Sequence, residues 1–68
     1  MEEYFVNNYA QANGDHEMHT RSCYWRHMGE NMRSLGVFGN CHDALKAAKH
    51  VFPQADGCKF CCPDCHHS

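Results

Sequence analysis

Aromatic and β-branched residues gather near the N-terminus and predict a strand over residues 4–10. Asn13 and Gly14 follow, the pair that a two-residue type I′ hairpin turn prefers. Residues 17–20 would then form the returning strand. This turn predicts that His19 lies opposite Asn8 across the hairpin.

The second half of the chain changes to a helical spacing of apolar residues. Residues 35–38 predict a short third strand, and Asn40 with Asp43 three positions later is a helix start signal. The apolar residues that then repeat at helical spacing are Ala44, Leu45, Ala47, Ala48, Val51 and Phe52. Pro53 ends the helix. Residues 55–57 would turn the chain into Cys58, and residues 63–66 would form one final helical turn.

These elements predict the α+β class, with a small three-stranded antiparallel sheet, one packed helix and a C-terminal zinc knuckle. We expect residues 1–68 to form a single small zinc-stapled domain. A chain of this length buries only about 60% of its unfolded surface, so its core alone leaves it marginally stable. A metal or disulfide staple is therefore expected.

The chain contains many residues that could form such a staple, since six cysteines and seven histidines occur among its 68 residues. The formal charge of −2 does not indicate the clustered basic face typical of nucleic-acid binding. The acidic N-terminus lacks a long apolar run, so we expect no secretory signal, no membrane span and a cytoplasmic protein. A reducing compartment would favour free or metal-bound thiols.

Two short motifs have the spacing of metal ligands. The first is His19-x3-Cys23, and the second is Cys58-x2-Cys61, led by Gly57. Three thiols and one imidazole match closed tetrahedral zinc sites, so one Zn²⁺ is expected at His19, Cys23, Cys58 and Cys61. Closing the long intervening segment with a metal would turn binding energy into folding energy.

Other cysteines and histidines leave alternatives open. Cys65 and His66 are rivals for the fourth ligand position. They would also form a second small site with His16 and His67, although a solvated tail is the simpler interpretation. An even count of six cysteines also suits a disulfide-stapled exported domain.

Cys41 lies in the first turn of the expected helix, in register with the apolar helical residues. We expect it to be a small buried apolar side chain. A reactive thiol is the alternative, because a helix N-terminus lowers a cysteine pKa.

The order of motifs resembles the Ada-type metal-binding domain, which is also appended to some nucleases. The segments that carry the resemblance are residues 17–23, 35–38, 41–48 and 56–61. The resemblance implies that Cys23, Cys58 and Cys61 are zinc ligands and that His19 fills the fourth position. In the repair proteins of that family, a methyl-accepting cysteine stands where His19 stands here. An imidazole is not a comparable nucleophile, which argues against alkyl transfer.

The leading functional hypothesis is a structural zinc module, without catalysis, that presents a surface to a protein or nucleic acid. We expect a monomer, and the residues expected to contact nucleic acid are Arg21, Arg26, Arg33 and Lys59. An alternative is a zinc-activated thiolate, at Cys61 or Cys65, that accepts alkyl groups or senses oxidants.

Overall fold

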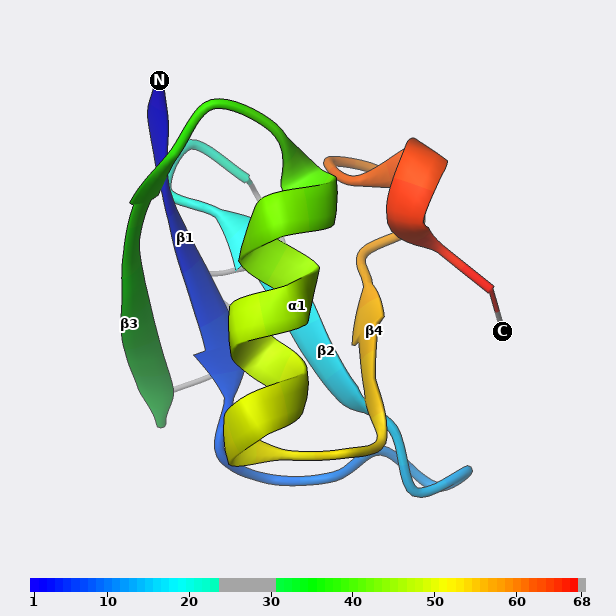
Figure 1. The fold of residues 1–68 in the computed structure, drawn as a ribbon. Helices are drawn as coiled ribbons and strands as arrows, with labels where there is room; N and C mark the ends of the chain where they lie inside the picture. The colour runs from blue at the N-terminus through cyan, green and yellow to red at the C-terminus, as the bar shows by residue number, and fades with distance from the viewer. Residues whose placement is uncertain (24–30, 68) are drawn as a thin grey trace.

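The computed structural model describes residues 1–23 and 31–67, which form one sheet with a helix packed across one face (Figure 1). The elements in chain order are β1 (Glu2–Asn7), β2 (His16–Thr20), β3 (Met32–Phe38), α1 (Cys41–Val51), β4 (Ala55–Gly57) and the 3₁₀ turn η2 (Pro63–Cys65). The α+β class is confirmed. The expected three-stranded antiparallel sheet is wrong, because the sheet has four strands in the order β3-β1-β2-β4.

The fourth strand is the segment that the sequence predicted to be a turn. β4 pairs parallel to β2, with Met18 opposite Gly57. The chain leaves β2 at one end of the sheet and returns after β3 and α1, and such a crossover is what a parallel pair requires. β4 has only three residues, which is too short to produce an alternating pattern, but all three are buried.

The hairpin between β1 and β2 has a different register from the one predicted. His19 lies opposite Phe5 rather than Asn8, and Met18 lies opposite Val6. β1 ends at Asn7, so the connection is longer than a two-residue turn. Within it Asn13 Oδ1 accepts a hydrogen bond of 2.9 Å from the backbone of Asp15, and Gly14 has φ +93°. The Asn-Gly pair does bend the chain, but inside a wider loop.

The core lies between α1 and the sheet face that it covers. Ala44, Leu45 and Ala48 are the buried residues of the helix. They pack with Val6 and Met18, both fully buried, from the two central strands. Asn40 caps α1, since its Oδ1 accepts from the backbone N–H of Asp43 at 2.9 Å. The helix start predicted from Asn40 and the stop predicted from Pro53 are thus confirmed.

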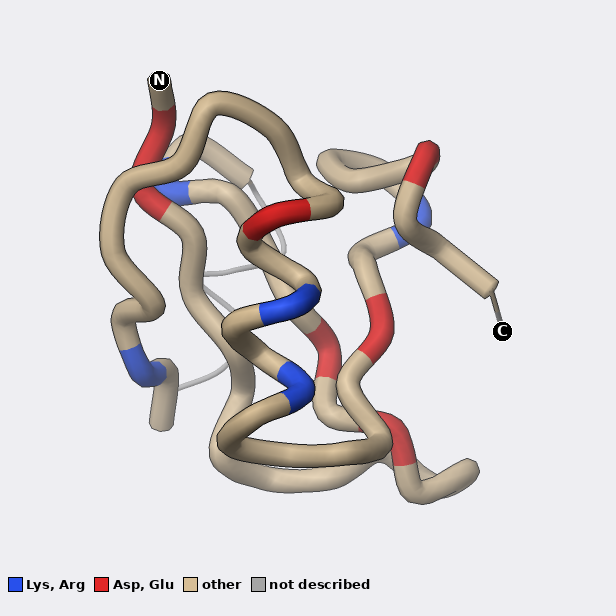
Figure 2. Tube along the Cα trace, in the orientation of Figure 1, with Lys and Arg blue, Asp and Glu red and all other residues tan. Residues whose placement is uncertain are grey.

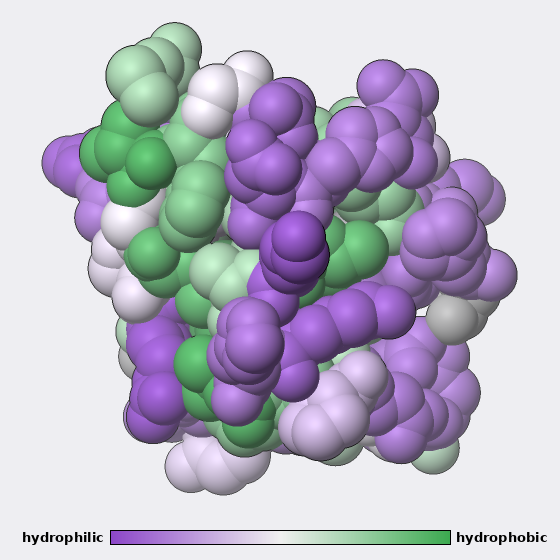
Figure 3. All heavy atoms as spheres, in the orientation of Figure 1, coloured by the Kyte–Doolittle hydropathy of each residue, from purple (hydrophilic) through white to green (hydrophobic). Residues whose placement is uncertain are grey.

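The surface divides into a polar and a more apolar part. Figure 3 shows hydrophilic side chains over the outer face of α1 and hydrophobic ones gathered toward β3. Large apolar side chains that are exposed to solvent include Val37 of β3 and Phe60 after β4. Within residues 1–23 and 31–67, no helix is long and apolar enough to cross a membrane.

Candidate metal centre

The two predicted metal motifs meet at one end of the β2–β4 pair. Met18 is part of the core beneath α1, so strand alternation directs the adjacent His19 to the opposite face of the sheet. Cys23 is turned back toward β2, because its N–H donates to Thr20 O at 3.1 Å. Cys58 directly follows β4, and its N–H donates to Met18 O at 2.8 Å. Parallel pairing therefore brings the C-terminal motif alongside the N-terminal one.

The donor atoms of these two motifs form a compact group. One ligand atom from each of His19, Cys23, Cys58 and Cys61 lies within 4.8 Å of the others. Cys23 Sγ is 3.9 Å from Cys58 Sγ, and Cys61 Sγ is 3.9 Å from His19 Nδ1. Neighbouring thiolates in a tetrahedral zinc site are about 3.8 Å apart, given Zn–S bonds of about 2.3 Å. The structure thus contains a four-residue group that could hold a metal ion.

Backbone N–H groups surround the sulfurs of the C-x2-C motif. Phe60 N donates to Cys58 Sγ at 3.4 Å, and Thr20 N donates to Cys61 Sγ at 3.4 Å. Cys62 N donates to Cys58 O at 2.8 Å, which closes the turn. Such donors favour the charged form of a sulfur. The turn is therefore built to hold thiolates.

Glu17 orients the imidazole of His19. Glu17 Oε1 lies 3.1 Å from His19 Nε2, which assigns the imidazole proton to Nε2, and Nδ1 lies 3.9 Å from Cys61 Sγ. Gln11 holds the same carboxylate by donating to Glu17 Oε2 at 2.7 Å. The sequence patterns did not predict a role for Glu17. A signal was present, because Glu17 stands two positions before His19 in a predicted strand, and residues two apart in a strand share a face.

Without a metal, the thiols of Cys58 and Cys61 resist ionisation. Burial raises the pKa of Cys58 to about 12. The pKa of Cys61 is also raised, first because its thiol donates to the sulfur of Cys62 and then because of burial. The same hydrogen bond lowers the pKa of Cys62. A cation is needed to hold the Cys58 and Cys61 thiolates at neutral pH.

A second group of potential ligands connects the start of α1 to η2. Cys41 and Cys65 are disulfide-bonded, and His42 Nδ1 lies 3.6 Å from Cys65 Sγ. These three residues also form a group that could hold a metal ion. The prediction of Cys41 as a buried apolar side chain is wrong, because it is half-buried and paired.

The other histidines are engaged elsewhere. His66 Nδ1 donates to Gly57 O at 3.0 Å and lies 3.4 Å from a carboxylate oxygen of Asp56. His16 stacks on Phe52 with ring centroids 3.8 Å apart. The structure thus places His66 and Cys65 outside the four-residue group, and it does not bring His16 to Cys65.

The basic residues expected to contact nucleic acid do not converge in the described part of the chain. Arg21 pairs with Glu3 at 2.9 Å. Arg33 belongs to β3 and lies over the ring of Phe52, whereas Lys59 follows β4 at the other edge of the sheet. Arg26 lies outside the described residues. Figure 2 shows acidic and basic positions interspersed along the chain.

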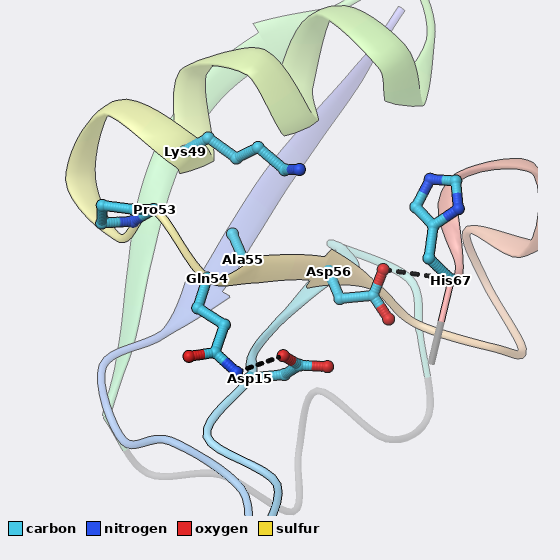
Figure 4. Close-up of a pocket in the computed structure, with 7 residues that line it drawn as sticks. All are labelled: Asp15, Lys49, Pro53, Gln54, Ala55, Asp56 and His67. Atoms are coloured by element: carbon cyan, nitrogen blue, oxygen red, sulfur yellow. Dashed lines mark hydrogen bonds between the residues drawn. The ribbon is translucent and has the colours of Figure 1, made fainter.

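A shallow hollow lies beside β4, on the side of the C-terminal end of α1 (Figure 4). It is lined by Asp15, Lys49, Pro53, Gln54, Ala55, Asp56 and His67. Its two carboxylates are already engaged: Gln54 Nε2 donates to Asp15 at 3.0 Å, and the backbone of His67 donates to Asp56 at 2.9 Å. These contacts fasten the loops around β4, so the hollow has a structural explanation.

No protein-family model, curated protein or solved structure matches this chain. The Ada-type resemblance therefore stays a prediction from the sequence.

Proposed function

We propose that this chain is a structural zinc module in which one Zn²⁺ joins His19, Cys23, Cys58 and Cys61. In this proposal the metal fastens the N-terminal half of the sheet to the C-terminal knuckle. The module would act by presenting its surface to a macromolecular partner, with no catalysis of its own.

The proposal is carried by the closed ligand group with its supporting hydrogen bonds. Four soft or borderline donors fill a tetrahedral shell and leave no position for a reactive water. His19, Cys23 and Cys58 are buried, and Cys61 is half-buried. The hydrogen bond from His19 Nε2 to the Glu17 carboxylate is typical of zinc-bound histidine, in which the second ring nitrogen donates to an acid. Three thiolates favour Zn²⁺ over harder ions such as Mg²⁺ or Ca²⁺.

The modest core supports a stabilising role for the metal. Among residues 1–23 and 31–67, Val6 and Met18 are the only fully buried side chains of substantial size apart from cysteines. A chain of this length usually requires a staple beyond its core. Metal bound only by the folded state would supply that stability.

Metal loading and removal test the proposal. We expect native mass spectrometry of the disulfide-intact protein to find one zinc, and a chelator to abolish the thermal unfolding transition of the loaded fold. The variant His19→Ala should lose the metal, whereas the control His66→Ala should keep it. A protein that holds less than half an equivalent, and keeps its fold in chelator, would contradict the proposal.

The surface of this chain favours a protein over a nucleic acid as the proposed partner. Arg33 and Lys59 lie at opposite edges of the sheet, while Val37 and Phe60 are exposed apolar side chains. Phosphate recognition would make binding fall steeply with salt. Measurable affinity for duplex or single-stranded DNA in 50 mM salt, lost at about 200 mM, would reverse this preference.

The alkyl-acceptor alternative receives little support from the same geometry. Cys23 and Cys58 are buried, and the sulfurs of Cys58 and Cys61 accept backbone hydrogen bonds that lower their nucleophilicity. Cys61 is the one proposed ligand sulfur with partial exposure. Mapping methyl transfer from a methyl phosphotriester onto Cys61 of the zinc-loaded protein would favour the alternative.

A further inference from the structure

We propose that Cys41, His42 and Cys65 form a second metal site that is closed by the disulfide and opened by reduction. In the oxidised state the two sulfurs are bonded to one another. After reduction by a low-molecular-weight thiol, the two thiolates and the imidazole would bind a second Zn²⁺. This site shares no residue with the group at His19.

His42 lies beside the sulfur of Cys65. Its Nδ1 already lies 3.6 Å from Cys65 Sγ, close to the separation of neighbouring ligands on one zinc ion. The donor atoms of all three residues lie within 4.8 Å of one another. Moving the sulfurs from a bond of about 2.05 Å to the zinc spacing of about 3.8 Å requires less than about 1 Å from each. Side-chain rotation supplies such a movement without a new backbone fold.

The backbone around Cys65 is held independently of the disulfide. Cys65 N donates to Cys62 O at 3.0 Å, and His67 N donates to Asp56 Oδ1 at 2.9 Å. His66 Nδ1 also donates to Gly57 O. On the other side Cys41 and His42 are fixed in the first turn of the capped helix. Opening the disulfide therefore leaves the three ligands near one another.

The exposure of the three residues is consistent with a site that becomes available on reduction of the disulfide. Cys65 is fully buried, Cys41 is half-buried and His42 is exposed. An attacking thiol would reach the Cys41 sulfur first and release Cys65. Three protein ligands leave the fourth zinc position to water, whereas the group at His19 supplies all four ligands.

The exchange balances as a two-electron reaction. The protein disulfide and two molecules of a small thiol yield two protein thiols and one small-molecule disulfide. Binding of Zn²⁺ then forms two Zn–S bonds and expels the two thiol protons. In the reverse direction, a small-molecule disulfide accepts two electrons from the thiolates, the Cys41–Cys65 bond re-forms and the ion leaves.

Zinc stoichiometry in the two redox states tests this inference. The oxidised protein should bind one equivalent, and the protein reduced with a phosphine and desalted without oxygen should bind two at micromolar free zinc. Replacing exposed His42 in His42→Ala should weaken the second equivalent at least tenfold and leave the first unchanged. His50→Ala, at another exposed position of the same helix, is the matched control.

Two results would overturn the inference. One is a reduced wild-type protein that takes up no more zinc than the oxidised protein. The other is a His42→Ala variant that binds the second equivalent as tightly as wild type. The first equivalent separates this from the proposed function: oxidised wild type that holds one zinc and gains none on reduction overturns this inference alone, whereas oxidised wild type that holds none overturns the proposed function.

Discussion

Glu17 determines which nitrogen of His19 faces the cysteines. Its carboxylate accepts a hydrogen bond from Nε2–H, which leaves the Nδ1 lone pair free for a metal. Glu17→Gln should therefore lower zinc affinity about 10- to 100-fold while the stoichiometry stays the same. Competition with a chromophoric chelator measures the change. Asp64→Asn, an equal loss of charge at an exposed position of η2, should have no such effect.

Gly57 shows how tightly a single residue position is packed. A Cβ added there would lie 2.8 Å from the Cβ of Cys65 and 2.9 Å from its backbone carbonyl carbon and oxygen. Gly57→Ala should lower the free energy of unfolding by about 1–3 kcal/mol, because backbone must move to remove the overlap. Gly39→Ala is the control, since nothing lies within 4 Å of its added Cβ. Equal urea midpoints for the two variants would contradict the packing argument.

At the scale of elements, α1 depends on its cap. Asn40 satisfies the backbone N–H of Asp43. Asn40→Ala should destabilise the zinc-loaded protein by about 1 kcal/mol, within the usual range of about 0.5–2 kcal/mol for such caps. Thermal unfolding measures the loss, with the exposed mid-helix change Lys46→Ala as comparison. A cap variant no less stable than Lys46→Ala would show that tertiary packing alone holds the helix.

The elements differ in how far the sequence could predict them. The signals at Asn40 and Pro53 are local, and they located α1 correctly. β4 is specified by pairing with a distant strand, and no local pattern in three residues reports that. The hairpin register failed for a related reason. Asn13-Gly14 indicates a bend, but the loop length depends on the hydrogen bonds of its neighbours, such as Gly14 N to Gln11 O.

The two cysteine groups also differ in whether local spacing could predict them. The spacing from His19 to Cys23 and from Cys58 to Cys61 identified four residues that the fold brings together. The Cys41–Cys65 pair was missed, because connectivity among six cysteines cannot be deduced from their order alone.

At the scale of the whole molecule, metal binding should be coupled to proton release. The pKa of Cys58 is raised to about 12 and that of Cys61 is raised as well, so both are thiols at pH 7 before metal binds. Zinc uptake at pH 7 should therefore release about two to three protons, and affinity should rise steeply from pH 6 to 8. Calorimetry in buffers of different ionisation enthalpy gives the count. Release of fewer than one proton would contradict thiolate ligation.

The stability of the metal-free protein should fall as pH rises, whereas zinc affinity should increase. The folded pKa of Cys58 lies above its ordinary value of 9.0, so the stability linked to this thiol is fully present below pH 9. It is lost as pH rises toward about 12. Chelated protein that retains residual structure should thus lose it in this alkaline window, as followed by circular dichroism. A Cys58→Ala variant should lose less structure across this window, since Cys61, whose pKa is also raised, still titrates.

The parallel pairing of β2 with β4 also has a consequence during protein synthesis. Half of the proposed zinc ligands precede the helix, and the other half follow it, 35 positions after Cys23. A ribosome adding about 5–20 residues per second therefore needs about 2–7 s to make the second half after the first. During that interval His19 and Cys23 have been made but the two ligands that would complete their group have not. Folding of the sheet is consequently a late event in synthesis, because β4 can pair with β2 only after the helix has been made.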